Sequence, residues 1–149
     1  MVGIEPLPYF VDHSREAIES AGVGGRARVE TIPAETMAFD REFDVVTQIQ
    51  VFHELPHKKK PEILLACRRA LRDDGRLVLI DRCLPGREEE IGDRRFTMSV
   101  LEQWFEVSWG NVVHTRGEIL ALLDDAGFVV ESEDEKAVPT YWTFVAKPA

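Results

Sequence analysis

The chain has 149 residues, a length that fits one domain with one hydrophobic core. Acidic residues exceed basic ones, 27 Asp and Glu against 18 Lys and Arg, for a formal net charge of -9. This balance argues against a general nucleic-acid binder, because phosphate backbones are bound by clustered Lys and Arg. No apolar run approaches the ~20 residues that a membrane-spanning helix needs, so we expect no membrane partner.

The N-terminus and the cysteines together predict a cytoplasmic protein. The N-terminus has neither the basic start nor the long apolar stretch of a signal peptide. Cys67 and Cys83 are the two cysteines, and they form neither a pairing framework nor a metal-binding spacing. We expect both to be free thiols in a reducing compartment, and we expect no bound metal.

Apolar runs of strand length alternate with helix-period segments, which predicts βαβ units and a parallel sheet. In the first half we expect strands over residues 1–5, 27–32 and 43–50 and helices over residues 9–21 and 61–71. Gly22 closes the first of these helices.

Two expectations concern the middle of the chain. The strand over residues 43–50 carries Val45, Val46 and Ile49 and is expected to be buried on both faces, as parallel strands usually are. The Asp-Asp-Gly segment at residues 73–75 is expected to stop the helix before it.

The clearest helix signal in the second half is a capping box. The Thr115 hydroxyl can accept the amide of Glu118 while the Glu118 carboxylate reaches back, which predicts a helix from Thr115 to Gly127. The other expected elements are a strand over residues 76–83, a charged loop over 84–95, a helix over 97–107 and final strands over 128–132 and 141–147. The last two strands could pair antiparallel.

The first strand is similar to part of a known family. Residues 2–5, Val-Gly-Ile-Glu, followed by Pro8 and Phe10, resemble the second strand and turn of class I S-adenosylmethionine-dependent methyltransferases. In that family an acidic residue, here Glu5, ends the strand, where a carboxylate can accept both hydroxyls of a ribose.

Residues 31–39 are similar to the family's loop after the third strand, which reads the adenine edge. Pro33 stands where the family usually has an Asp, and it has neither a carboxylate nor an N–H. The resemblance leaves the Ala34 amide and the Glu35 side chain for adenine.

The resemblance extends over nearly the whole chain. Residues 43–55 and 67–81 are similar to the family's fourth strand and to the helix, turn and fifth strand that follow. The C-terminal third resembles small-molecule O-methyltransferases in particular, through Asp81, Pro85, Gly86 and residues 104–110, 115–118, 126–128 and 141–148. The motifs are individually weak, and their order carries the resemblance. It implies a single domain over residues 1–149, with a doubly wound, mostly parallel Rossmann-like α/β sheet and an antiparallel C-terminal strand.

The family's glycine-rich turn and first strand have no counterpart in this sequence. The resemblance therefore implies an N-terminally truncated domain without its first central strand, which in the family lies between the second and the fourth. Two buried strand edges would then carry unpaired backbone groups. The chain could be a fragment of a longer enzyme, could borrow a strand from a second copy in a homodimer or from a complementing chain, or could pair strands two and four directly.

His53 is the candidate catalytic residue. It aligns with the histidine that acts as general base in many O-methyltransferases, just beyond the fourth strand, and histidine suits proton removal near neutral pH. A first-turn histidine can also simply cap or pack, and the family's supporting carboxylate appears here as Val113. The resemblance implies cofactor-binding roles for Glu5, Phe10, Ala34, Glu35 and Gln48.

Aromatic residues form a candidate acceptor pocket. Trp104, Phe105 and Trp109 could line a pocket for a flat aromatic acceptor, since such pockets are mostly apolar, although aromatic residues at helical spacing can equally be core or a dimer face.

We expect S-adenosylmethionine-dependent methyl transfer to a small molecule, to oxygen, with S-adenosylhomocysteine as product. One alternative is a non-catalytic, repurposed methyltransferase-like assembly or regulatory subunit. A dinucleotide-dependent oxidoreductase is a third, but it explains Glu5 and not the C-terminal pattern.

Overall fold

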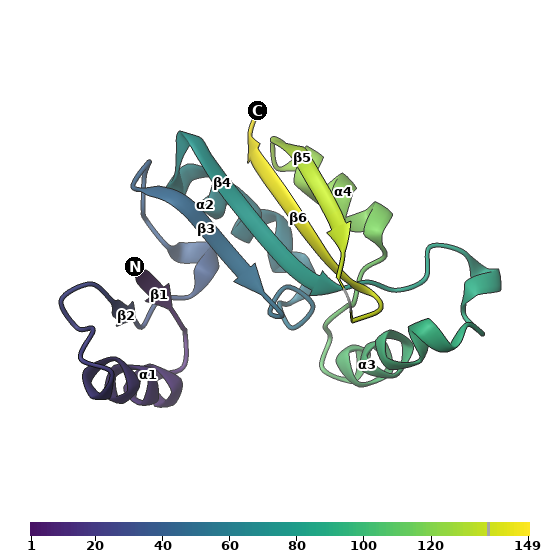
Figure 1. Cartoon of the computed structure of the whole chain (residues 1–149), viewed down its shortest axis with the longest axis horizontal. Helices are drawn as coiled ribbons and strands as arrows, with labels where there is room; N and C mark the ends of the chain where they lie inside the picture. Colours follow the sequence, from purple (N-terminus) through teal and green to yellow (C-terminus); the bar gives the residue numbers. More distant parts are fainter. Residues whose placement is uncertain (137) are drawn as a thin grey trace. The chain divides into compact units, whose positions relative to one another are not determined.

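The computed structural model describes residues 1–136 and 138–149, and the chain divides into two compact units. The first unit is Met1–Ala38 and the second is Phe39–Ala149. Figure 1 shows strands and helices in each unit. Each unit contains one parallel strand pair, so the predicted βαβ alternation is confirmed in both.

The first unit is one βαβ element. β1 (Val2–Ile4) pairs in parallel with β2 (Arg28–Glu30), and α1 (Pro8–Ser20) connects the two strands. Pro8 begins the helix because its fixed φ suits the first helical turn, and Gly22, with a φ of 66°, follows its end. A short 3-10 turn, η1 (Ala34–Thr36), follows β2.

The second unit is built on a four-stranded sheet in the order β3-β4-β6-β5. Its strands are β3 (Phe43–Ile49), β4 (Leu71–Arg82), β5 (Phe128–Glu135) and β6 (Tyr141–Pro148). β3 is parallel to β4, whereas β6 is antiparallel to both β4 and β5. The predicted Rossmann-like α/β fold with an antiparallel C-terminal strand is confirmed. Within residues 1–136 and 138–149, no strand pairs with both β1 and β3.

Two helices form the core of the second unit with this sheet. α2 (Lys60–Ala70) and α4 (Arg116–Asp125) contact each other and lie on the same side of the sheet (Figure 1). The core side chains are fully buried: Leu64, Leu77, Leu79, Ile119, Leu123 and Phe144. The remaining elements are η2 (His57–Lys59), η3 (Glu88–Glu90), η4 (Arg94–Phe96) and α3 (Thr97–Ser108). The capping box of Thr115 and Glu118 begins α4 as predicted.

β3 is more exposed than the sequence predicts. Val45 and Ile49 are 52% and 57% exposed, so the prediction that this strand is buried on both faces is wrong. β3 is an edge strand of its sheet, and its side chains alternate between two faces. Gln48 points to the face that the helices cover and is 7% exposed, whereas Val45 and Ile49 point the other way.

The end of α2 also differs from the prediction. The helix ends at Ala70 and β4 begins at the next residue, so the Asp-Asp-Gly segment at residues 73–75 lies in the strand rather than in a helix-ending turn. Gly75 allows close packing there, because a Cβ atom would lie 3.0 Å from the Phe43 carbonyl oxygen.

Candidate active site

His53 lies just beyond the carboxyl end of β3. The strand ends at Ile49, and the Gln50 backbone N–H donates to the carbonyl of Ile80 on β4 at 2.8 Å. Gln50 then turns the chain with a φ of 52°. The His53 side chain is 8% exposed, at the edge where the parallel strands β3 and β4 both end. In doubly wound folds, this edge is where ligands bind.

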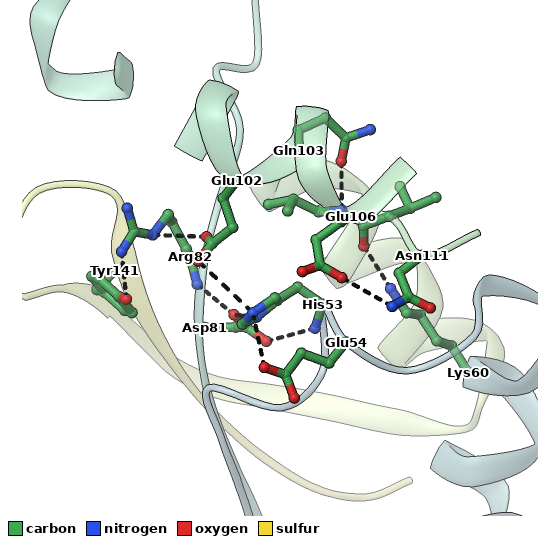
Figure 2. A network of polar contacts seen from close by, with 12 residues as sticks. His53, Glu54, Lys60, Asp81, Arg82, Glu102, Gln103, Glu106, Asn111 and Tyr141 are labelled. Carbon is green, nitrogen blue, oxygen red and sulfur yellow. Dashed lines mark hydrogen bonds and ion pairs between the residues drawn. The ribbon is translucent and has the colours of Figure 1, made fainter. Parts of the chain in front are cut away.

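Asp81, near the end of β4, holds His53 through two hydrogen bonds (Figure 2). Its carboxylate Oδ1 lies 2.6 Å from His53 Nδ1, and its Oδ2 accepts the His53 backbone N–H at 2.9 Å. The backbone N–H of Arg82 also donates to Oδ1, at 2.7 Å. A carboxylate in this position keeps the proton on Nδ1, which leaves the lone pair of a neutral imidazole on Nε2.

Two further carboxylates flank His53 Nε2. Glu102 on α3 and Glu54 each place an Oε1 atom 3.9 Å from Nε2. Glu102 Oε2 forms an ion pair with Arg82 Nε at 2.9 Å, and Arg82 Nη2 donates to the Tyr141 hydroxyl at 2.6 Å. The Glu102 side chain is 26% exposed and that of Glu54 62%, so Glu102 is the better fixed of the two.

The charges around His53 set its basicity. Burial lowers the pKa of His53, but the hydrogen bond and charge of Asp81, together with the charges of Glu102 and Glu54, outweigh burial and raise the pKa above its ordinary value. Burial also raises the pKa of Glu102, against the opposing charges of Arg82 and His53. The neutral His53 side chain is therefore a stronger base than free imidazole.

The segment between α3 and α4 is tied to the same region (Figure 2). Lys60 on α2, with 0% exposure, donates to the Val112 carbonyl oxygen at 2.6 Å. The Gln103 side-chain oxygen accepts the Val113 backbone N–H at 2.7 Å. These bonds fasten α3 to the body of the unit and so fix the position of Glu102.

Four of the five predicted cofactor residues lie in the first unit. Glu5 follows β1, and its side-chain oxygen accepts the backbone N–H two residues further on at 2.9 Å. Phe10 is 52% exposed on α1, and Ala34 and Glu35 begin the turn η1.

Gln48, the fifth predicted cofactor residue, lies on β3 in the second unit. It is 7% exposed, and its amide nitrogen donates to the Cys67 sulfur at 3.2 Å. Its Oε1 atom is buried and has no hydrogen-bond partner in the described part of the chain. The side chain faces the interior of the second unit, and its cofactor role stays a prediction.

The predicted acceptor pocket lies along α3. Trp104 and Phe105 line a hollow of about 710 Å³ with Val100, Gln103, Val107 and Ser108. Trp104 and Trp109 are 71% and 70% exposed. Each residue of an α-helix turns the chain by about 100° around the helix axis. Trp104, two positions after Glu102, therefore lies on a different face of α3. The acceptor role of the aromatic residues stays a prediction.

The sequence predicted the position of His53 but not the carboxylate that supports it. The expected place for that carboxylate holds Val113, and Asp81 supplies it instead. The sequence could have predicted Asp81 near His53, because the carboxyl ends of neighbouring parallel strands meet at one edge of the sheet. Glu102 and Tyr141 carry no such signal, because they come from elements that are distant in sequence.

Residues 1–136 and 138–149 contain no group of three or more His, Cys, Asp or Glu side chains that could hold a metal ion. Cys67 and Cys83 are buried and free, and burial raises their pKa values to about 11 and about 12. No helix in the described residues combines the length and apolar character needed to cross a membrane.

The chain belongs to the methyltransferase domain family, whose pattern matches residues 1–79, more than half of its length. Comparison with curated protein sequences finds no match.

Several solved structures have the same fold, and methyltransferases are among them. Mitomycin 7-O-methyltransferase MmcR is 19% identical with a TM-score of 0.84, over 99% of this chain and 41% of that chain. LaPhzM is 21% identical with a TM-score of 0.82, over 99% and 42%. Geranyl diphosphate methyltransferase, solved in complex with S-adenosylmethionine, is 11% identical with a TM-score of 0.77, over 99% and 68%. The chain thus spans about two fifths of the length of the first two, and at these identities the likeness shows the fold.

Proposed function

We propose that this chain, by itself or as part of a larger assembly, transfers a methyl group from S-adenosylmethionine to an oxygen atom of a small molecule. Family membership supplies the reaction class. The observation that supports oxygen as the target is the His53–Asp81 pair, with Nδ1 held 2.6 Å from the carboxylate and Nε2 outside that bond. A hydroxyl acceptor needs such a base, because it attacks far better once its proton is removed.

His53 and Asp81 have distinct roles in this proposal. Nε2 of the neutral imidazole takes the proton of the acceptor hydroxyl, and Asp81 stabilises the imidazolium that forms. Asp81 remains ionised throughout and keeps the ring in one tautomer and one orientation. Its backbone hydrogen bond to His53 at 2.9 Å fixes the carboxylate at the same time.

The residues of the chain fit the adenosine half of S-adenosylmethionine, which supplies a methyl group on a cationic sulfur when bound. Glu5 ends a strand with a carboxylate that can accept ribose hydroxyls, and Ala34 can present its backbone amide to adenine. Gln48 is assigned to the same group, and its buried Oε1 atom has no hydrogen-bond partner in the described residues. We assign Phe10 and Glu35 to the same group of cofactor residues.

The partners are a hydroxyl-bearing small molecule and a second polypeptide. The aromatic side chains along α3 are proposed to contact the acceptor. A second copy of the chain, or a complementing chain, is proposed to cover β3, where Val45 and Ile49 are 52% and 57% exposed. The same exposed strand favours the second candidate function, a non-catalytic assembly subunit.

Calorimetric titration with S-adenosylhomocysteine separates the two functions. Methyl transfer by this chain requires binding, and Glu5→Ala is expected to weaken it, whereas Glu16→Ala, an exposed carboxylate on α1, is the matched control. Absence of binding would contradict autonomous methyl transfer and leave the assembly role. Tight binding would contradict a non-catalytic role.

A further inference from the structure

The surroundings of His53 Nε2 suit more than one hydroxyl group. Nδ1 is occupied by Asp81, so an acceptor hydroxyl has to approach Nε2, which has Glu102 Oε1 and Glu54 Oε1 each 3.9 Å away (Figure 2). A separation of 3.9 Å is too long for a direct hydrogen bond. An acceptor oxygen at hydrogen-bond distance from Nε2, ~2.8 Å, lies close to Glu102 when it approaches Nε2 from the side that faces α3.

A lone hydroxyl is poorly matched to this arrangement. It has one proton to donate, which it gives to Nε2, and ionised carboxylates can only accept hydrogen bonds. As the proton leaves, negative charge develops on the acceptor oxygen beside Glu102, and like charges repel in a partly buried site. A second donor on the acceptor, adjacent to the reacting hydroxyl, would convert this repulsion into a hydrogen bond.

Glu102 is fixed in a position to receive that donor. Its Oε2 forms an ion pair with Arg82 Nε at 2.9 Å, although the two atoms do not meet hydrogen-bond geometry. Arg82 in turn donates to the Tyr141 hydroxyl at 2.6 Å, and its guanidinium lies 4.6 Å from the centre of the Tyr141 ring. Glu102 Oε1, the oxygen nearer Nε2, accepts no hydrogen bond from the described residues. Glu54 lies at the same distance from Nε2, but its side chain is 62% exposed and solvated.

We propose that Glu102 determines acceptor specificity by accepting a hydrogen bond from a second donor group, a hydroxyl or an N–H, on the atom next to the one that carries the reacting hydroxyl. The expected acceptor class is therefore a vicinal diol, an ortho-dihydroxy aromatic ring or an ortho-amino phenol. Arg82 and Tyr141 are positioning residues that hold the Glu102 carboxylate. This inference rests on the proposed function, because it needs the hydroxyl to approach His53 Nε2.

Binding of small probes to His53 tests the inference without requiring turnover. The His53 imidazole resonances of isotope-labelled protein are followed by NMR during titration with catechol, 2-methoxyphenol or phenol. We expect catechol to bind roughly tenfold more tightly than the other two probes. The other two lack the second hydroxyl that would donate a hydrogen bond to the charged Glu102 carboxylate. In Glu102→Gln the preference is expected to fall, because a neutral amide oxygen accepts more weakly than a carboxylate, and in the matched control Glu54→Gln it is expected to persist in full.

Each outcome decides the inference. Equal affinities for catechol and phenol, no perturbation of His53 by any probe, or a catechol preference that is undiminished in Glu102→Gln would overturn it. Glu102→Asp, which keeps the charge, should retain part of the preference, and circular dichroism of each variant separates misfolding from lost recognition. Titration with S-adenosylhomocysteine tests the proposed function separately. If that ligand binds and catechol is not preferred, the inference about Glu102 is wrong and the proposed function stands.

Discussion

Asp81 contacts His53 at the ring nitrogen Nδ1 and at the backbone N–H, 2.6 Å and 2.9 Å from its two oxygens. Its carboxylate is 1% exposed, so these hydrogen bonds are shielded from water and from salt. A buried charge is stable only when it is paired, and His53 and the backbone N–H of Arg82 provide that pairing. Orientation of the base and stability of the strand ends therefore depend on the same side chain.

Replacing Asp81 with Asn should lower the pKa of His53. The negative charge and the charged hydrogen bond that raise this pKa are removed, while burial, which lowers it, remains. NMR titration of the His53 imidazole in the two proteins measures the difference, and exposed His13 serves as an internal reference whose resonances should be unchanged. An identical His53 titration in Asp81→Asn would mean that the pair does not form in solution.

His114 is a second buried histidine with a different environment. It is 4% exposed, neither ring nitrogen has a hydrogen-bond partner in the described residues, and Glu118 Oε2 is 3.6 Å from Nδ1. Burial is the main cause that lowers the pKa of His114 to about 4, and the charge of Lys60 is the second cause. The charge of Glu118 acts in the opposite direction. The folded protein therefore holds this side chain neutral where the unfolded chain would protonate it.

This depressed pKa predicts a loss of stability in acid. Between about pH 6.5 and pH 4 the unfolded chain binds a proton at His114 that the folded chain does not, so the free energy of unfolding falls as the pH falls through this window. We expect about 2 kcal/mol less stability from His114 at pH 5 than at pH 7. Urea unfolding at both pH values measures this difference in the free energy of unfolding. The His114→Phe variant should lose less stability between pH 7 and pH 5 than the natural chain. Equal losses in the two proteins would contradict the assignment.

At the residue scale, the sequence predicts where a functional residue lies along the chain better than it predicts which side chains contact that residue. His53 was placed correctly after β3 because a strand end is a local signal. Its contacts with Asp81 and Glu102 span 28 and 49 positions along the chain and depend on strand register and helix packing, which local patterns do not contain.

At the scale of elements, Gly75 is the residue that lets β3 and β4 approach. A Cβ atom there would lie 3.0 Å from the Phe43 carbonyl oxygen and 3.1 Å from that of Arg72, and backbone atoms cannot move aside as a flexible side chain can. The β3–β4 register shifts opposite this point. An Asp-Asp-Gly sequence is a turn signal by composition, and the tertiary packing overrides it.

Gly75→Ala should therefore destabilise the protein by about 1–3 kcal/mol through overpacking. Gly86→Ala is the matched control, because a Cβ atom at that position meets nothing within 4 Å. Chemical denaturation of both variants measures the difference in the free energy of unfolding. Equal stability of the two variants would show that the strands do not approach as closely as the structure has them.

Some elements follow directly from local chemistry. The Thr115 and Glu118 capping box begins α4 through hydrogen bonds within four residues, and the sequence predicts it correctly. The exposure of β3 depends instead on which strands and helices surround it, so an apolar run alone predicts burial wrongly.

At the scale of the whole molecule, the chain has the fold of methyltransferases and two compact units. Glu5, Phe10, Ala34 and Glu35 belong to the first unit, and Gln48 and His53 belong to the second. The cofactor assignment thus draws on both units, while the His53–Asp81 pair is complete within the second. The proposed base can therefore be tested independently of the cofactor residues.

Transfer of a labelled methyl group from S-adenosylmethionine to catechol, compared between the natural chain and His53→Ala, tests the central claim most directly. The account predicts transfer by the natural chain and a loss of roughly 10²–10⁴-fold in His53→Ala, the usual contribution of a general base. His13→Ala, which removes an exposed histidine of α1, should retain the full rate. An unchanged rate of methyl transfer in His53→Ala would contradict the role of His53 as the general base.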